Sequence, residues 1–214
     1  MALQVQTAYN SFSRFKQDIT DVDTDTFLDW CKWLHNFVYR YYLGIEPSRF
    51  FTTQSYTVTT SPSTQALPST FKEMTKFGTG IFVVSSSTTT DEQLAYTGLG
   101  RTDSGYYIDG NNIVFTGITS GSLLMRFIPK LTALTALTDY FTLDILSTGK
   151  DVISEEWLDD FVIKALDVMY TQWDEDIGTE GISDARFVRL LDEFARNIRR
   201  TPAVYSLEDS SLNF

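Results

Sequence analysis

The sequence has few of the residue types from which reactive sites are built. It contains one cysteine, Cys31, and one histidine, His35, among its 214 residues. A single cysteine excludes an internal disulfide and leaves the redox compartment open. A single histidine excludes a site made of several imidazole ligands, and we expect His35 to lie at a helix surface or at the edge of the core. We also expect no nucleophile pair between Cys31 and His35.

Long apolar runs are missing as well. No segment approaches the roughly 18 to 20 apolar residues that span a bilayer. The beginning of the sequence, MALQVQTAYN, contains neither the basic region nor the apolar run of a signal peptide. We therefore expect a soluble protein that is made in the cytosol and has no membrane partner.

Complete motifs for metal or phosphate binding are also lacking. Asp21-x-Asp23-x-Asp25 resembles the start of a calcium loop, but the sixth position is Thr26 instead of glycine and the twelfth is Lys32 instead of glutamate. Gly98-Leu99-Gly100 lacks the spacing of a phosphate loop and the Lys-Ser/Thr pair that follows it. We interpret the first motif as a solvated capping turn and the second as a simple turn. The sequence thus predicts no catalytic, cofactor-binding or metal site.

Positive charge is scarce, most of all in the last third of the chain. The formal net charge is −11, of which residues 1–150 carry −2 and residues 151–214 carry −9. An acidic chain binds nucleic acid poorly, because affinity for phosphates comes largely from lysine and arginine. Such a charge suits a soluble protein, a basic partner, or a surface past which nucleic acid slides without binding.

Acidic runs and a basic cluster lie at the ends of predicted helices. Glu155-Glu156 and Asp174-Glu175-Asp176 are consecutive acids, whereas acid–base catalysis needs two carboxylates at a defined separation across a cleft. We interpret both runs as solvated charge at helix ends. Arg196, Arg199 and Arg200 suit the C-terminal end of a helix dipole, and they could also pair with acids of a neighbouring subunit.

Helical spacing of apolar residues predicts four helices. The predicted helices cover residues 6–17, 24–42, 154–173 and 183–200. The second has the clearest signals, with Asp23 or Thr24 as N-cap, Gly44 at its end and Pro47 to prevent a restart. Ser154 is predicted to cap the third helix.

Residues 50–130 differ in composition from the helices on either side. They are rich in Thr, Ser and aromatic residues, and their short alternating segments predict a small antiparallel sheet. Asp109-Gly110-Asn111 supplies a tight turn, Ile113 and Phe115 alternate along the strand after it, and Pro129 ends the last strand. The other strands are predicted at residues 54–60, 65–68, 81–85, 93–96, 106–108 and 123–128, with a polar loop at 85–90.

The expected fold class is therefore α+β: a small helical bundle with an inserted antiparallel β module and an extended C-terminal tail. Its parts are the N-terminal helices (1–49), the β module (50–130), a connector (131–153), the C-terminal helices (154–200) and the tail (201–214). Tyr39 points away from the other aromatic residues of its helix, so it could serve an interface. Four residues of the tail have the character of interface anchors: Tyr205, Leu207, Leu212 and Phe214.

Several of these features follow one another in a recognisable order. A helix precedes a Thr/Ser-rich stretch that reaches Ala66-Leu67-Pro68-Ser69-Thr70-Phe71. The residues that mark the following segments are Tyr107, Gly110-Asn111, Ile113, Phe115, the strand Leu124–Pro129, and then Ala165, Tyr170 and Asp174 of a closing helix. This order, over roughly residues 24–175, resembles the head-to-tail adaptor (connector or neck) proteins of tailed bacteriophages. The resemblance lies in the composition and the order of the segments and not in a signature motif.

The resemblance implies a structural protein and not an enzyme. Such adaptors assemble as a ring, commonly of twelve copies, beneath the portal, and extend the DNA channel toward the tail. The implied partners are other copies of the chain, the portal protein and other neck or tail proteins, in a virion assembled after synthesis in the host cytoplasm. Residues 205–214, with Arg196, Arg199 and Arg200, would serve interfaces, and Glu155, Glu156 and Asp159 would face passing DNA.

Two alternatives stay open. The chain could be a tail-associated binding module, either a tail-tube or a receptor-contact protein, that uses the β insertion as its contact surface. It could also be a small hydrolase whose carboxylates are brought together by folding. A ring interface that buries the tail favours the adaptor, a trimer with outward β tips favours the receptor-contact protein, and a cleft with two facing carboxylates favours the enzyme.

Overall fold

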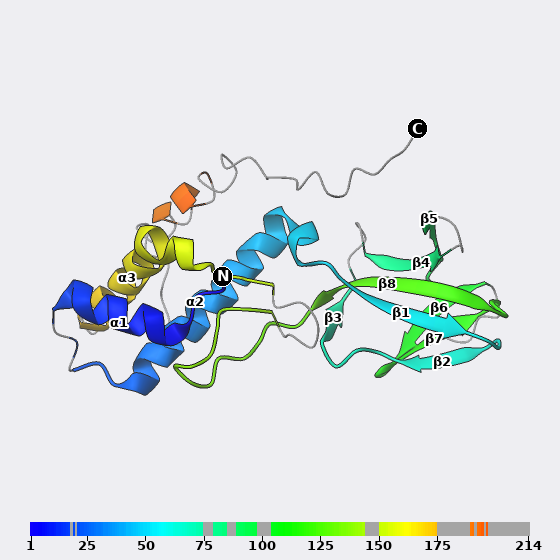
Figure 1. Ribbon diagram of the computed structural model, residues 1–214, viewed down its shortest axis with the longest axis horizontal. Helices are drawn as coiled ribbons and strands as arrows, with labels where there is room; N and C mark the ends of the chain where they lie inside the picture. The colour runs from blue at the N-terminus through cyan, green and yellow to red at the C-terminus, as the bar shows by residue number, and fades with distance from the viewer. Residues whose placement is uncertain are drawn as a thin grey trace.

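A helical bundle and a β module lie end to end in the computed structural model of the protein (Figure 1). The structure describes residues 1–17, 19, 21–74, 79–84, 89–97, 104–143, 150–174, 189–190, 192–194 and 196. Helices and antiparallel strands are segregated, so the predicted α+β class is confirmed. The tail predicted at residues 201–214 lies outside the described residues.

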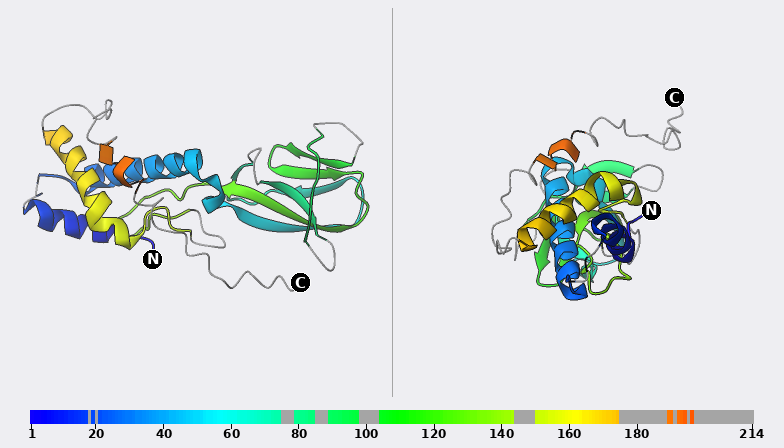
Figure 2. Two further views of the ribbon diagram at one scale, coloured as in Figure 1. Left: turned by 90° about the horizontal axis from the view of Figure 1, so that it is seen from above. Right: turned by 90° about the vertical axis from the view of Figure 1, so that its left-hand side faces the viewer.

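The helical bundle is built around one long helix. The described α-helices are α1 (Val5–Lys16), α2 (Thr24–Ile45) and α3 (Ile163–Asp174). α2 has 22 residues, and α1 and α3 pack beside its N-terminal half (Figure 2). The helix predicted at residues 183–200 is described only at 189–190, 192–194 and 196, which are helical.

α2 begins as predicted but ends differently. The Asp23 side chain accepts a hydrogen bond from the Thr26 N–H at 2.6 Å, which caps the helix. Gly44 does not end the helix, which continues to Ile45. Pro47 then opens a short 3-10 helix, η1 (Pro47–Phe50), because a proline at the first helical position lacks only an N–H that would have no partner there.

The predicted single helix from Ser154 is replaced by three helical forms in succession. A 3-10 helix, η2 (Glu155–Trp157), leads into a π-helix, η3 (Leu158–Val162), and then into α3. Ser154 occupies the N-cap position of η2, as predicted, but its side chain makes no capping hydrogen bond. Phe161, Val162 and Ile163 are all buried, and the wider turn of the π-helix lets three successive side chains enter the core.

One apolar core holds the bundle together and draws on distant parts of the chain. Its largest fully buried side chains are Leu3, Phe12, Phe27, Leu34, Phe50, Phe141 and Phe161. Each such side chain contributes about 1.5–3 kcal/mol relative to an exposed one. An ion pair between Lys16 and Asp167 joins α1 to α3, and the Lys16 ammonium also lies 4.8 Å from the ring centroid of Tyr170.

The β module contains eight strands. They are β1 (Thr52–Val58), β2 (Ser63–Ala66), β3 (Phe71–Glu73), β4 (Gly80–Val84), β5 (Thr89–Gln93), β6 (Gly105–Asp109), β7 (Asn112–Thr116) and β8 (Gly121–Pro129). β6 and β7 form the predicted hairpin, with Gly110 at a positive φ of 57° in its turn. β5 occupies part of the segment predicted to be a polar loop.

The strands form two sheets, so the prediction of one sheet is wrong. One sheet has the order β1-β8-β4-β5, with β3 on the end of β8, and the other has the order β2-β7-β6. Their facing side chains share a second apolar core that includes Ile113 and Phe115 from β7 and Leu123, Met125 and Phe127 from β8. β8 alternates as predicted over residues 123–127, whereas β7 does not, because Val114 and Thr116 are buried as well as Ile113 and Phe115. The two strands face one another across the core and are not neighbours in one sheet.

A short segment after β5 joins the two sheets at one side. Leu94 donates its N–H to Ile81 of β4, whereas Tyr106 of β6 donates its N–H to Ala95 and accepts from Thr97. The segment therefore crosses from one sheet to the other within a few residues. This crossing closes one side of the sandwich and leaves β1 and β2 as the edge strands on the other side.

The β module enters the bundle through two neighbouring antiparallel strands, β1 and β8. The buried Tyr39 hydroxyl on α2 donates to the Pro129 carbonyl at 2.9 Å, which fixes the end of β8. The Lys150 ammonium donates to the Phe51 carbonyl, which fixes the start of β1. Phe50 is fully buried in the bundle core immediately before β1. These contacts set the module rigidly on the bundle.

Removal of the Tyr39 hydroxyl should weaken this junction. Tyr39→Phe leaves the buried Pro129 carbonyl without its donor, so we expect the free energy of unfolding to fall by about 1–3 kcal/mol. Tyr41→Phe is the matched control, because the Tyr41 hydroxyl makes no hydrogen bond with any described residue. Urea unfolding measures both variants, and equal stabilities would show that the hydroxyl does not secure the junction.

Candidate functional site

Four exposed carboxylates form an acidic turn just before α3. We call Glu155, Glu156, Asp159 and Asp160, on η2 and η3, the acidic turn. Within the part of the chain that the structure describes, none of these side chains makes an ion pair. The turn is therefore a negatively charged surface open to solvent. It includes Glu155, Glu156 and Asp159, the residues predicted to face DNA.

Aromatic side chains beneath the acidic turn hold it in place. The ring of Trp157 stacks on Tyr42 at 6.2 Å between centroids, and the Arg49 guanidinium lies over both rings at 4.5 Å from Tyr42 and 5.2 Å from Trp157. Phe194 packs on the other side, 4.7 Å from Trp157 and 4.2 Å from Phe161. The turn thus links α2, the start of the β module and the C-terminal residues. Its charges have a fixed position on the bundle.

The residues predicted to serve interfaces are only partly described. Arg196 is exposed two residues after buried Phe194, on the segment that covers Trp157. Arg199, Arg200 and the four predicted anchors of the tail lie outside the described residues: Tyr205, Leu207, Leu212 and Phe214. Arg196 makes no ion pair with any described carboxylate.

Tyr39 does not serve an interface, contrary to the sequence-based interpretation. Its side chain is 3% exposed because β8 ends against this side of α2. Burial raises the pKa of its phenol, and the neighbouring Glu73 carboxylate adds to the rise. The half-buried aromatic residues of α2 are instead Trp33, Phe37 and Tyr41. Trp33 and Phe37 stack at 5.0 Å between ring centroids.

Cys31 and His35 are both buried in the bundle core. Their spacing of four residues puts them on one face of α2, so helix geometry alone does not separate them. Both are almost inaccessible, at 0% and 1% exposed, and burial raises the pKa of the Cys31 thiol. The His35 ring packs edge-on against Phe141 at 5.4 Å. His35 therefore lies in the core and not at a helix surface or core edge.

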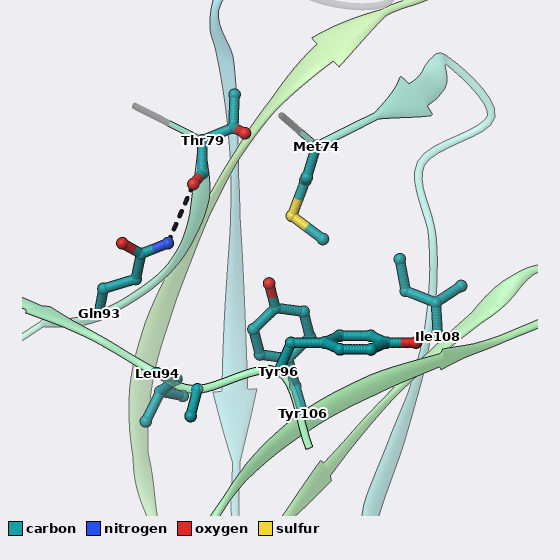
Figure 3. A pocket seen from close by; sticks show the side chains of 8 residues that line it. Met74, Thr79, Gln93, Leu94, Tyr96, Tyr106 and Ile108 are labelled. Atoms are coloured by element: carbon teal, nitrogen blue, oxygen red, sulfur yellow. Dashed lines mark hydrogen bonds between the residues drawn. The ribbon is translucent and has the colours of Figure 1, made fainter. Parts of the chain in front are cut away.

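The β module contains an open cavity that sequence reasoning did not find. It measures about 590 Å³ and is lined by Met74, Thr79, Gln93, Leu94, Ala95, Tyr96, Tyr106 and Ile108. Figure 3 shows the two tyrosine rings at its centre, with Met74 above them and Leu94 and Ile108 on either side. The rings meet edge to face at 5.7 Å, and Tyr96 is 62% exposed. We call this the tyrosine cavity.

None of the described residues that line the tyrosine cavity is charged, although the chain as a whole is strongly acidic. Its one hydrogen bond among the side chains drawn runs from the Gln93 amide to the Thr79 carbonyl at 3.1 Å (Figure 3). Burial raises the pKa of Tyr106, and the nearby Tyr96 adds to the rise, so the phenol stays protonated near neutral pH. Such a lining suits an uncharged, largely apolar group.

No set of residues for metal or membrane binding emerges from the described ranges. Among them, no group of three or more His, Cys, Asp or Glu side chains lies close enough to hold a metal ion. The described helices are also too short or too polar to cross a bilayer. The two surfaces that the geometry offers are the acidic turn on the bundle and the tyrosine cavity on the β module.

Buried His35 should make the protein less stable in mildly acidic solution. Desolvation lowers its pKa from 6.5 to about 3, although its hydrogen bond to the Thr142 backbone opposes the shift. Below pH 6.5 the unfolded chain therefore binds a proton that the folded chain does not. Stability is lost as the pH falls, by up to about 2 kcal/mol between pH 6.5 and 5.

The His35→Gln variant separates this effect from the titration of carboxylates. It keeps a neutral polar side chain but cannot bind the proton, so its free energy of unfolding should change less between pH 6.5 and 5. Urea unfolding at several pH values measures the two slopes. Identical slopes would contradict a neutral, buried His35.

The chain was also compared with known proteins. No protein-family model matches it, and no curated protein matches it.

Proposed function

We propose that this chain is a structural subunit of the head-to-tail connector of a tailed bacteriophage. It would form a ring with other copies beneath the portal, extend the DNA channel and provide the surface to which the tail attaches. In this role the chain has no catalytic centre and needs no cofactor. Its partners are other copies of itself, the portal protein and further neck or tail proteins, and its place is the neck of the virion.

The architecture is the observation that supports the proposal most. Segments before and after the β module, including α1, α2 and α3, share one core, and the β module projects from one end of that bundle. Both module strands that enter the bundle are fixed by buried contacts from Tyr39 and Lys150. A rigid part with a projecting β module, in the order that the resemblance describes, suits a subunit that must contact several neighbours at once.

The acidic turn supports a role beside DNA. Carboxylates repel phosphates, and a channel wall without exposed lysine or arginine releases no counterions to bind the duplex. The charges of Glu155, Glu156 and Asp159 are exposed and unpaired in the described structure. In the proposed ring these residues face the channel and let DNA pass without binding.

The tyrosine cavity supports a second candidate, a tail-associated binding module. Tyr96 is exposed beside the cavity, and tyrosine is enriched at protein interfaces. In this alternative the β module contacts a receptor or another tail protein. The two candidates differ in place, because a neck subunit lies between head and tail and a receptor-contact protein lies at the far end of the tail.

Particles assembled without this chain should show the defect of a missing connector. We expect filled heads and separate tails, because the surface that joins them is absent. Electron microscopy of particles from a host in which the chain is not made measures this. Complete particles that only fail to adsorb to cells would contradict the connector and favour the receptor-contact protein.

Charge reversal tests the channel role of the acidic turn. The triple variant Glu155→Lys, Glu156→Lys and Asp159→Lys places cations on the proposed channel wall, so we expect slower genome ejection. Asp21→Lys, Asp25→Lys and Asp29→Lys form the matched control, because these exposed acids lie just before α2 and in its first turns, although Asp29 also pairs with Lys32. Ejection kinetics from purified particles measure both variants, and equal rates would show that the turn does not face DNA.

A further inference from the structure

β1 is an edge strand that lacks the usual protection against pairing with another strand. It pairs with β8 over all seven of its residues, without a bulge, and its other side has no strand partner among the described residues. Natural edge strands are commonly shortened, bulged, covered, or protected by charged side chains or proline. The exposed side chains of β1 are Thr53, Gln54, Ser55 and Thr57, none of which is charged.

The absence of charge extends well beyond β1. Residues 50–71 form the longest stretch of the chain without a charged side chain, in a protein with 21% charged residues. This stretch contains β1 and also β2, the edge strand of the other sheet. The Tyr56 hydroxyl on β1 donates to the Ala66 carbonyl on β2 at 3.1 Å, so the two strands lie together. The two edge strands on this side of the sandwich therefore carry no charged side chain.

The backbone groups of β1 that face away from β8 can be assigned. In an antiparallel pair, both polar groups of one residue point the same way, and successive residues alternate. The carbonyls of Ser55 and Thr57 accept side-chain amide bonds from Gln54 at 3.0 Å and Gln65 at 3.4 Å. Thr53, Ser55 and Thr57 thus point their N–H and C=O groups outward. Two flexible glutamines occupy part of this edge, and an incoming strand could displace them.

We propose that the edge of β1 is a contact surface between copies of this chain, made by strand pairing. Each copy carries a formal charge of −11, so two copies repel one another wherever their acidic surfaces meet. The neutral side formed by β1 and β2 is where two copies can approach without that repulsion. Outward backbone groups at residues 53, 55 and 57 then supply the hydrogen bonds. The inference goes beyond the proposed function and does not depend on it.

Ser55→Pro tests the pairing with little effect on the fold. It removes an N–H that points away from β8, and proline is tolerated on an edge strand when its missing N–H faces solvent. Ser55→Ala is the matched control, because it keeps the N–H. Sedimentation equilibrium of the full chain over a wide concentration range should show association for the natural chain and Ser55→Ala, and markedly weaker association for Ser55→Pro.

Two further measurements keep the test independent of the proline. Thr53→Lys with Thr57→Lys places charges along the edge and should also weaken association, whereas Asn112→Lys, at the exposed first residue of β7, should not. Added salt should strengthen association of the natural chain, because it screens the repulsion between acidic copies. A natural chain that stays monomeric at every concentration and salt level, or equal association of Ser55→Pro and Ser55→Ala, would overturn the proposal.

A single introduced thiol shows which edge β1 meets. Because Cys31 is buried, Ser55→Cys presents one accessible thiol. Disulfide-linked dimers under oxidation would show that β1 pairs with β1 of a second copy, and association without such dimers would show that it pairs with another edge. Both outcomes support the contact. Neither outcome depends on where the chain lies in a virion. Failure of this inference can therefore be distinguished from failure of the proposed function.

Discussion

The structure depends on one constraint: two neighbouring strands must leave an apolar core and re-enter it at the same place. β1 starts directly after buried Phe50, and β8 ends at Pro129 under the Tyr39 hydroxyl. Because the strands are paired along their length, fixing both at the bundle fixes the direction of the whole β module. The Lys150 ammonium completes this junction by holding the Phe51 carbonyl. Contacts within the bundle therefore set the direction in which the surfaces of the β module face.

The same junction ties the module to the acidic turn. Arg49, next to buried Phe50, covers Tyr42 and Trp157, and Trp157 belongs to η2 at the start of the turn. Phe194 then packs on Trp157 from the C-terminal side. The β module, the acidic turn and the C-terminal residues thus meet in one aromatic cluster.

Local sequence predicts much of the fold, and the predictions that were wrong failed for physical reasons. α2 could be predicted because its apolar spacing and the Asp23 cap agree, and the β6–β7 hairpin because Asp109-Gly110-Asn111 specifies a turn. Alternation along β8 shows which of its side chains are buried but not which strand lies beside it, so two facing sheets were mistaken for one. The π-helix η3 could not be predicted, because it arises from packing of three successive apolar side chains.

The surfaces were predicted unevenly for related reasons. The acidic turn was predicted to be solvated because burying a charge costs free energy, and its side chains are exposed in the structure. Tyr39 was assigned to an interface because its helix face differs from that of its aromatic neighbours, and only the tertiary position of β8 reveals why that face is buried. The described lining of the tyrosine cavity comes from four segments of the chain, so no local sequence pattern predicts it. The exposure of Tyr96 becomes visible only in the structure.

The central claim, a place between head and tail, is tested most directly by electron microscopy of particles from the source, labelled with an antibody against this chain. The account predicts label at the single tail vertex, at the level of the neck. Label at the far end of the tail, label elsewhere on the particle, or no label in intact and opened particles alike would contradict it.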